Sequence, residues 1–471
     1  MNFVDPVFFV FLALFIGPYL LLKGSARMAW LLLASYVFYG WASPAFTLLL
    51  LASTLGDYLI GLGMEKRDAA GRRRLAVWSV VLNLGFLGYF KYSAFVWNDL
   101  LAPLCAWLGR PLLPVERDLP PVGISFYTFQ TLSYSLDVWR GEIPASRSLL
   151  RFATYVSMFP QLVAGPIVRA RDLLPQLDNP RLPNAAAARA GLLRCTRGFL
   201  KKACLADSLA LLLVDPCYAN PAAHGPGEVL LAVIAYSFQI YFDFSGYSDM
   251  AIGLGQLLGF RFQENFDHPY RARSFSEFWS RWHISLSSWL RDYLYIPLGG
   301  NRLGRAHTLV NLLLTMLLGG LWHGASLLFL LWGLLHGLFL VAQRLFEWRW
   351  PAARRWVPEG IKTAVCFALV TLAWIPFRAG SCDKMLAVFS GLAHLNAASL
   401  EQALTRGSWP VGLLLCICFA AHFLAAPLAK LARFRAWPLE LRLAAWASIA
   451  FWCLHYFPED AKVQPFIYFQ F

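Results

Sequence analysis

The chain has 471 residues, of which 58% are hydrophobic and 14% are charged, and its formal net charge is +14. A soluble domain is about half apolar and about a quarter charged, so this composition excludes an ordinary soluble enzyme and predicts an all-α, polytopic integral membrane protein. The basic residues cluster in short segments between apolar runs, which the positive-inside rule explains without nucleic acid as a partner. The nine cysteines are scattered without metal-ligand spacing, so we predict neither a metal site nor a disulfide framework.

Apolar stretches recur along the whole chain, and a helix needs about 20 apolar residues to cross the hydrocarbon core of a bilayer. We expect roughly ten to twelve spans. They lie near Pro6–Leu22, Met28–Trp41, Phe46–Met64, Leu75–Val96, Leu192–Val214, Val229–Phe242, Thr308–Gln343, Ile361–Phe377, Gly412–Leu428 and Leu441–Phe457. No flexible linker or repeat divides them, so residues 1–471 are interpreted as one membrane domain.

The ends of the spans predict the topology. The first apolar run has no basic region before it and no small-residue cleavage site after it, so we interpret it as a retained helix rather than a signal peptide. The basic segments are expected to be cytoplasmic loops. They are Lys66-Arg67 with Arg72-Arg73-Arg74, then Arg194, Arg197 and Lys201-Lys202, and finally Arg433 and Arg435. Three spans precede the first segment, which predicts an N-terminus outside the cytoplasm.

Three regions differ from simple crossings. Pro120–Trp139 is semi-apolar and rich in hydroxyl groups, which predicts a re-entrant or pocket-lining segment, because polar groups at that depth need protein or water beside them. Tyr155–Pro166 ends in prolines and a glycine that break a helix. Glu264–Gly300 is polar and dense in Trp, Arg and Ser, which predicts an interfacial helix that borders a cavity.

Two histidines lie in a stretch without Asp, Glu, Lys or Arg, from Thr308 to Gln343. A single helix of about 36 residues would be about 54 Å long, so we expect a break at Gly319-Gly320, which would place His323 beside it. His323 is either a neutral imidazole bonded to a neighbouring helix or a general base, because its unperturbed pKa is near neutral. His336, in the same stretch, is a weaker candidate for chemistry.

Other polar groups are candidates because they adjoin apolar runs. His283 lies among tryptophans and serines, a pattern that by itself is typical of an aromatic interfacial belt. The run from Tyr241 to Asp249 places Asp243 and Asp249 at the end of an apolar stretch, where charge is costly. Structural pairing of these carboxylates with Arg261, Arg271 or Arg273 is the alternative to a functional role.

These motifs together resemble the membrane-bound O-acyltransferase family. Three of them occur in a fixed order: Tyr241–Asp249 with Met250-Ala251-Ile252-Gly253-Leu254-Gly255, then Arg281-Trp282-His283, then Trp322-His323-Gly324. Further runs fit the bacterial branch that contains the alginate O-acetylation membrane subunit and the D-alanyl transfer protein of teichoic acids. They are Tyr89-Phe90-Lys91-Tyr92, Gly123–Gln130 and Phe159–Pro166. The resemblance extends from about residue 30 to about residue 380.

The resemblance implies a fold and roles for these residues. It implies a ring of about eleven transmembrane helices, with re-entrant and interfacial helices, around a central tunnel. His323 corresponds to the invariant histidine of the family and His283 to its second functional histidine. We expect Trp282 and Trp322 to wall the tunnel, and Tyr241, Asp243 and Asp249 to order polar groups around it. His336 is kept as a pocket residue.

The same resemblance implies an O-acyltransferase of the bacterial inner membrane that moves a short acyl group, acetyl above all. The donor would be acetyl-coenzyme A or an acyl-carrier thioester in the cytoplasm, with no bound cofactor. A periplasmic esterase-like partner of the SGNH type would pass the group to a polysaccharide, an alginate- or cellulose-like exopolysaccharide ahead of peptidoglycan. A proton-coupled transporter or flippase, and a scaffold of a polysaccharide secretion complex, are the alternatives.

Overall fold

The fold is helical throughout the part of the chain that the structure describes. The computed structural model describes residues 1, 3–41, 44–116, 120–351, 356–406, 409–424 and 466–467, and no β-strand occurs among them. Within these ranges five helices are long and apolar enough to cross a membrane: Pro44–Glu65, Ala69–Trp107, Pro226–Leu257, Leu327–Arg349 and Glu359–Ala379. The predicted all-α, polytopic membrane architecture is confirmed.

The expected spans are recovered unevenly. Those at Phe46–Met64, Leu75–Val96, Val229–Phe242 and Ile361–Phe377 fall inside four of the five long helices. Two shorter apolar helices, Pro6–Leu21 and Val411–Phe423, match the first expected span and most of Gly412–Leu428. Leu441–Phe457, Arg433 and Arg435 lie outside the described residues. The total number of spans, the ring and the tunnel stay predictions.

The chain forms two compact units, Met1–Thr196 with Ser248–Glu264, and Arg197–Tyr247 with Asn265–Phe471. The single membrane domain stays a prediction. The helices of the first unit are α1 (Pro6–Leu21), α2 (Gly24–Gly40), α3 (Pro44–Glu65), α4 (Ala69–Leu87), α5 (Ser93–Phe95), α6 (Ala102–Trp107), α7 (Ile124–Arg140), α8 (Leu149–Ser157), α9 (Phe159–Leu162), α10 (Ala170–Asp178) and most of α11 (Ala185–Leu200). Short π-helical segments, Gly88–Tyr92 and Val96–Leu101, join α4, α5 and α6 into one continuous helix.

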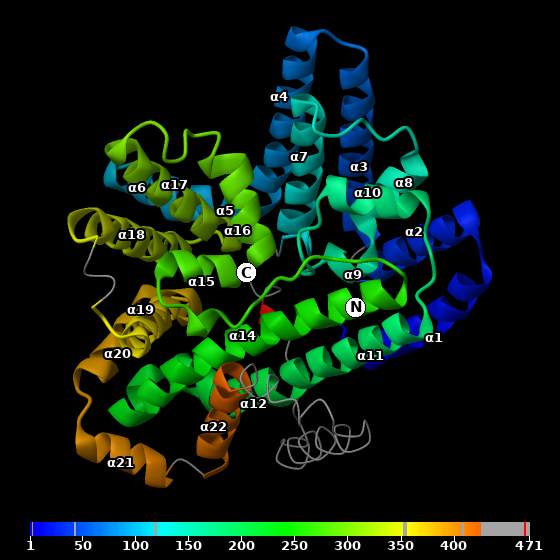
Figure 1. The fold of residues 1–471 in the computed structure, drawn as a ribbon. Helices are drawn as coiled ribbons and strands as arrows, with labels where there is room; N and C mark the ends of the chain where they lie inside the picture. Colours follow the sequence, from blue (N-terminus) through cyan, green and yellow to red (C-terminus); the bar gives the residue numbers. More distant parts are fainter. Residues whose placement is uncertain are drawn as a thin grey trace. The chain divides into compact units, whose positions relative to one another are not determined.

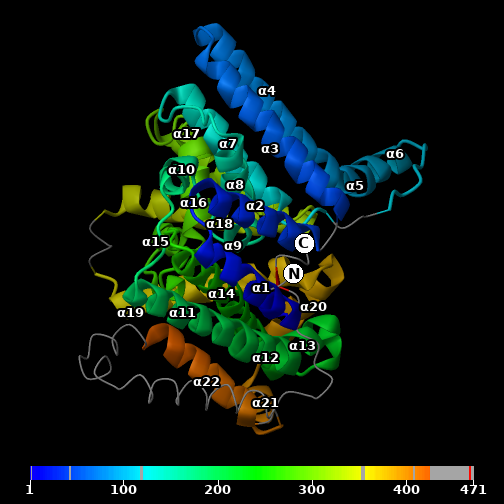
Figure 2. The ribbon, with the colours of Figure 1, turned by 90° about the vertical axis from the view of Figure 1, so that its right-hand side faces the viewer.

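In the first unit, α3 and α4 form a long antiparallel hairpin against which α7 packs (Figure 1; Figure 2). A buried polar cluster joins these helices. Asp57 of α3 accepts hydrogen bonds from Ser79 (2.6 Å) and Asn83 (2.7 Å) of α4, and from Ser135 of α7 (3.0 Å). Because an unpaired buried carboxylate would be costly, these donors hold the hairpin to α7. Nearly every side chain of α7 is buried in protein, as expected for a segment that does not face lipid; its re-entrant path stays a prediction.

The predicted helix break in Tyr155–Pro166 is confirmed. The α8 helix ends at Ser157, and the single turn of α9 ends at Leu162. A Cβ atom at Gly165 would lie 2.4 Å from the Cα atom of Gln161, so the turn that follows α9 requires glycine there.

The second unit contains the remaining helices and the predicted catalytic residues. They are α12 (Asp207–Leu209), α13 (Asp215–Ala219), α14 (Pro226–Leu257), α15 (Phe275–Arg281), α16 (Ile284–Leu290), α17 (Arg305–His323), α18 (Leu327–Arg349), α19 (Glu359–Ala379), α20 (Cys382–Ala393), α21 (Ala397–Arg406) and α22 (Trp409–Phe423). Single-turn π segments at Lys201–Ala206, Ala210–Val214 and Arg291–Tyr295, and 3₁₀ turns at Pro221–Ala223 and Pro269–Arg271, connect them. The last residues of α14 belong to the first unit.

The most apolar stretch of α14 is 83% buried, against 28% for α3. The α14 helix is therefore a core helix, whereas α3 exposes most of its surface. Glycines let α14 lie close to α11 and the π segment after it: a Cβ atom at Gly246 would be 2.7 Å from the carbonyl oxygen of Gly198, and one at Gly253 would be 2.7 Å from that of Gly191. Such small-residue contacts are typical of packed membrane helices.

One predicted loop is wrong. Arg194, Arg197, Lys201 and Lys202 lie in α11 and the π segment that continues it, not in a cytoplasmic loop. Lys202 has only 2% of its side chain exposed. The positive-inside rule counts basic residues in loops, and here Arg194 and Lys202 instead form ion pairs with the buried acids Asp249, Asp207 and Asp243.

The interfacial helix expected over Glu264–Gly300 is not one helix. The region folds as α15, α16 and two flanking single turns. The backbone of His268 (φ 45°) and His283 (φ 44°) lies in the left-handed region, which a helix cannot contain. These two residues therefore set the boundaries of the short segments.

The break in Thr308–Gln343 is real but was predicted at the wrong glycines. Gly319 and Gly320 lie inside α17, which ends at His323, and the Ser326 hydroxyl caps α18 by accepting from the Phe329 N–H. A Cβ atom at Gly320 would lie 2.3 Å from the carbonyl oxygen of Phe329 in α18. Gly320 therefore serves the close approach of α17 and α18, and the interruption occupies residues 324–326.

Candidate active site

The structure brings the two predicted catalytic histidines together in the second unit. The imidazole centroids of His283 and His323 are 6.3 Å apart, with an interplanar angle of 61°. The two side chains come from different elements, His283 from the junction of α15 and α16 and His323 from the last residue of α17. Both are buried, with 0% and 3% of their surface exposed. Their catalytic roles stay predictions.

A hydrogen-bond network orients His283. Its Nδ1 lies 3.2 Å from the side-chain oxygen of Asn265, which also accepts from the Ser285 N–H (3.2 Å) and hydroxyl (2.9 Å). The Ile284 N–H donates to the Asn265 carbonyl at 2.9 Å. Because an amide oxygen can only accept, Nδ1 is the protonated nitrogen of the neutral ring and Nε2 carries the lone pair. The strained left-handed backbone of His283 is thus held from both sides.

Burial lowers the pKa of His283 from its ordinary 6.5 to about 3. The imidazole is therefore neutral at physiological pH and a weak base. A neutral, oriented imidazole inside an apolar surrounding has the properties expected of a group that positions a substrate by accepting a hydrogen bond.

Aromatic side chains enclose His323. Its ring centroid lies 5.0 Å from that of Trp322, 4.9 Å from that of Trp332 and 5.5 Å from that of Phe377. Trp322 also lies 5.8 Å from His283 and so contacts both imidazoles, as expected for a wall residue. A Cβ atom at Gly324 would lie 2.0 Å from the ring of Phe329, so the turn after His323 accommodates only glycine beside that ring.

Trp282 and His336 line the same aromatic cluster without touching His323 directly. Trp282 packs on Phe278 (5.7 Å) and Trp374 (5.0 Å). The ring centroid of His336 lies 4.8 Å from that of Trp332, an indole that also contacts His323. Within the described part of the chain, neither ring nitrogen of His336 has a hydrogen-bond partner.

Asp243 belongs to a buried ion cluster in the second unit. The Lys202 ammonium lies 2.6 Å from Asp243 and 2.7 Å from Asp207, and the Ile467 N–H donates to the other Asp243 oxygen at 2.9 Å. The alternative of structural pairing is realised for Asp243, but with Lys202 and not with Arg261, Arg271 or Arg273. A buried ion pair of this kind is costly to break from one side.

Phe466, beside that contact, is fully buried. Its ring centroid lies 4.6 Å from that of Tyr247 and 5.7 Å from that of Phe244. Phe244 in turn meets the His283 imidazole edge to face at 4.6 Å. The end of the described chain therefore supports one wall of the histidine site.

Asp249 and Tyr241 each have partners of their own. Asp249 lies in the first unit, where Arg194 contacts it at 3.0 Å and also forms an ion pair with Glu264. Tyr241 packs on His422 at 4.6 Å and on Phe266 at 5.9 Å. Their predicted roles as tunnel residues stay predictions.

Sequence reasoning missed three residues that shape the site: Asn265, Lys202 and Phe244. Asn265 precedes His283 by 18 positions, and no helical or strand spacing connects them. Phe244 lies within the Tyr241–Asp249 motif, but the motif alone does not indicate its contact with His283. Lys202 lies 41 positions before Asp243, and the sequence gave no signal of that pairing.

The described residues contain no group of three or more His, Cys, Asp or Glu side chains placed to hold a metal ion. What they do contain is a pair of buried imidazoles, one with a fixed tautomer, inside a wall of indole and phenyl rings. Such a site can remove a proton from a hydroxyl group and exclude water from a reactive acyl group.

Comparison with known proteins identifies the family. Residues 36–353 match the membrane-bound O-acyltransferase family. The chain is 47% identical over 410 residues to a probable alginate O-acetylase of Pseudomonas aeruginosa, covering 85% of this chain and 76% of that protein. It is 33% identical over 431 residues to a peptidoglycan O-acetyltransferase of Helicobacter pylori, covering 84% and 81%. It is 25% identical over 325 residues to a teichoic acid D-alanyltransferase of Bacillus subtilis, covering 64% and 81%. The chain therefore belongs to the membrane-bound O-acyltransferase family and is an O-acyltransferase.

Proposed function

We propose that this protein transfers an acetyl group from a cytoplasmic thioester towards hydroxyl groups of an extracytoplasmic polysaccharide, with an alginate- or cellulose-like exopolysaccharide as the acceptor. The names of the relatives support a polysaccharide acceptor and a short acyl group. The observation that carries the chemistry is the buried pair of His283 and His323, 6.3 Å apart.

In the proposed reaction, His323 removes the proton from the attacking hydroxyl group as its oxygen bonds to the acyl carbonyl carbon. The carbon–sulfur bond of the thioester then breaks, and the departing thiolate takes up the proton from the His323 imidazolium. The tautomer of His283 leaves a lone pair on Nε2, so this side chain cannot polarise the carbonyl by donating through that atom. It acts instead by positioning the reactants.

The aromatic wall has a chemical purpose in this scheme. Water would hydrolyse the thioester if it reached the carbonyl carbon, and desolvation also strengthens the electrostatic interactions inside the site. Trp322 contacts both imidazoles, which suits a side chain that shields the reacting atoms. His336 lies behind Trp332 and extends the pocket.

The donor is acetyl-coenzyme A or an acylated carrier protein, and the protein resides in the bacterial inner membrane with its N-terminus in the periplasm. A periplasmic partner with an esterase-like, SGNH-type fold completes delivery to the polymer. The basic residues Lys66-Arg67 that follow α3 support a cytoplasmic position for that end of the helix.

The experiment is to delete the chromosomal copy and restore it on a plasmid. O-acetyl groups are then measured by NMR on separately purified exopolysaccharide and peptidoglycan, with polymer yield measured in parallel. Loss of acetyl groups from the exopolysaccharide alone, with normal yield and restoration by the plasmid, supports the proposal. Loss from peptidoglycan alone would assign a different acceptor, and unchanged acetylation of both polymers would refute polysaccharide acetylation.

A further inference from the structure

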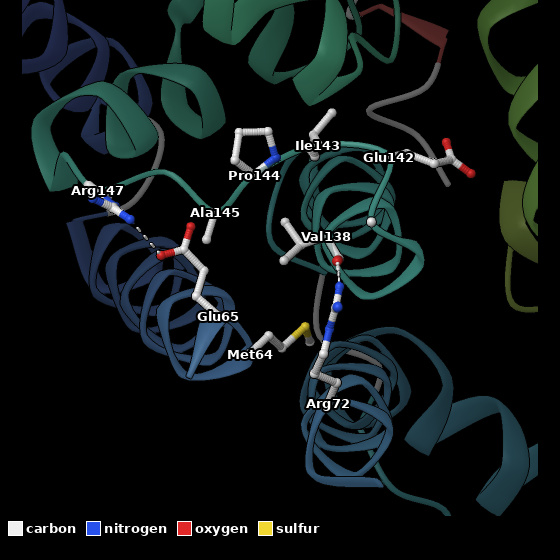
Figure 3. A pocket seen from close by; sticks show the side chains of 10 residues that line it. Met64, Glu65, Arg72, Val138, Glu142, Ile143, Pro144, Ala145 and Arg147 are labelled. Atoms are coloured by element: carbon white, nitrogen blue, oxygen red, sulfur yellow. Dashed lines mark hydrogen bonds and ion pairs between the residues drawn. The ribbon is translucent and has the colours of Figure 1, made fainter. Parts of the chain in front are cut away.

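A pocket of about 500 Å³ opens in the first unit at the end of the α3–α4 hairpin. It lies between the end of α3, the start of α4, the end of α7 and the loop 141–147 (Figure 3). Its volume falls within the range of small-molecule sites, about 300–1,000 Å³. None of its lining residues belongs to the histidine site.

Hydrogen bonds from three helices hold the walls of this pocket. Arg72 of α4 donates to the last carbonyl groups of α7, those of Val138 (2.7 Å) and Trp139 (3.1 Å). The Tyr134 hydroxyl accepts from the Ser146 N–H at 3.0 Å, and the Tyr58 hydroxyl donates to the Arg147 carbonyl at 3.0 Å. The loop is therefore fixed at both ends, and the pocket is preformed.

The charges at the pocket are of both signs. Glu65 and Arg147 face each other across one side, with 3.4 Å between carboxylate oxygen and guanidinium nitrogen, and Glu142 turns away from them (Figure 3). The Arg147 side chain is 85% exposed, and an exposed pair at that distance contributes little to stability. Its two members can therefore separate and each bind an opposite charge. Apolar side chains of Met64, Val138, Ile143 and Pro144 form the floor and sides.

The surroundings of the pocket are those of a membrane boundary. Glu65 is the last residue of a helix long enough to cross a bilayer, and basic residues follow it. On the outer faces of the hairpin, Leu55, Leu59, Val77 and Val81 are 46–56% exposed, as expected of side chains that contact lipid. A lipid whose headgroup occupies this pocket would have room for its acyl chains along these faces of the hairpin.

We propose that this pocket binds the zwitterionic headgroup of a phospholipid with a primary amine, of the phosphatidylethanolamine type. Arg147 binds the phosphate, and Glu65 accepts hydrogen bonds from the ammonium group. A primary ammonium has three N–H donors, whereas a trimethylammonium has none, so the site distinguishes ethanolamine from choline headgroups. A purely anionic headgroup would leave Glu65 unmatched. The proposal does not depend on the acyl-transfer function.

The test uses the full-length protein purified in detergent. Native mass spectrometry measures lipid occupancy during titration with phosphatidylethanolamine, phosphatidylcholine or phosphatidylglycerol carrying the same acyl chains. We expect at least threefold tighter binding of phosphatidylethanolamine than of the other two. Equal binding of ethanolamine and choline lipids, or tighter binding of the anionic lipid, would overturn the proposal.

Variants assign the site. Glu65→Gln should remove the preference, whereas Glu116→Gln, an exposed glutamate after α6, should keep it. Ala145→Trp fills the pocket with its charges intact and should lower the occupancy by phosphatidylethanolamine; melting curves check that each variant folds. The site is refuted if Glu65→Gln keeps the preference for phosphatidylethanolamine and Ala145→Trp keeps the original lipid occupancy. Displacement of the lipid by equimolar soluble glycerophosphoethanolamine would show that the free headgroup suffices and would overturn the lipid assignment.

Discussion

Replacing Asn265 with alanine should impair both the stability and the activity of the protein. The Asn265 side-chain oxygen is the acceptor for His283 Nδ1 and for the Ser285 N–H and hydroxyl. The asparagine itself is only 1% exposed, so bulk water does not replace the lost acceptor.

The magnitude follows from the donors that lose their partner. A buried donor without an acceptor costs about 1–3 kcal/mol. The Ser285 hydroxyl can rotate to another acceptor, which leaves two stranded N–H groups and a destabilisation of about 2–6 kcal/mol. Because the His283 ring would no longer be held in one tautomer, we expect acyl transfer to fall by about a hundredfold or more.

The assay is transfer of a labelled acyl group from thioester to acceptor in membranes adjusted to equal protein levels, with melting curves in detergent. Asn265→Asp keeps an acceptor and should retain far more stability than Asn265→Ala. Its negative charge should raise the pKa of His283 and make activity more sensitive to acid. Ser285→Ala removes one hydroxyl donor and is the matched control, with activity within a few-fold of the original. Full activity of Asn265→Ala at normal membrane levels would refute the proposed orienting role.

Three further outcomes follow from the packing and ionisation of the second unit. Lys202→Met leaves Asp243 buried without its counter-ion and should lower the stability by about 3–5 kcal/mol, as measured by melting in detergent. The double variant with Asp243→Asn should recover part of that loss. No recovery would argue against the ion pair. Gly324→Ala should abolish activity because its Cβ atom would meet the Phe329 ring at 2.0 Å, and Phe329→Ala should restore part of it if that clash is the cause. The folded-state pKa of His283, about 3, is below its unfolded value of about 6.5, so the unfolded chain binds more protons between these pH values. Lowering the pH from 7 to 5 should therefore reduce the free energy of unfolding by about 2 kcal/mol. A His283→Gln variant should not show this part of the loss. An equal pH dependence of melting in both proteins would contradict this burial.

The sequence predicted the membrane character and singled out the two histidines because both depend on local signals. Runs of apolar residues identify spans regardless of tertiary contacts, and Trp322-His323-Gly324 carries the family resemblance in three consecutive residues. The length of the apolar stretch around His323 predicted a helix break beside this residue. The position of the break did not follow from that length, because a glycine can serve either a helix end or a close helix contact, and Gly320 serves the contact with α18.

What could not be predicted depends on contacts between distant residues. Asn265 reaches His283 only because the left-handed backbone at residue 283 turns the ring back towards it. Lys202 was assigned to a loop because basic residues near apolar runs usually lie at the membrane surface. Its burial requires Asp207 and Asp243 on either side, and a pattern of charges along the chain does not reveal which acids meet which base.

The most direct test of the account is the His323→Ala variant in the deletion strain, with normal membrane levels verified. His394→Ala, an exposed histidine after α20, is the matched control. We expect the O-acetyl groups on the exopolysaccharide to disappear in the His323 variant while the polymer yield is unchanged, and the control to resemble the original protein. Normal acetylation in a well-expressed His323→Ala strain would contradict a catalytic centre at the buried histidine pair.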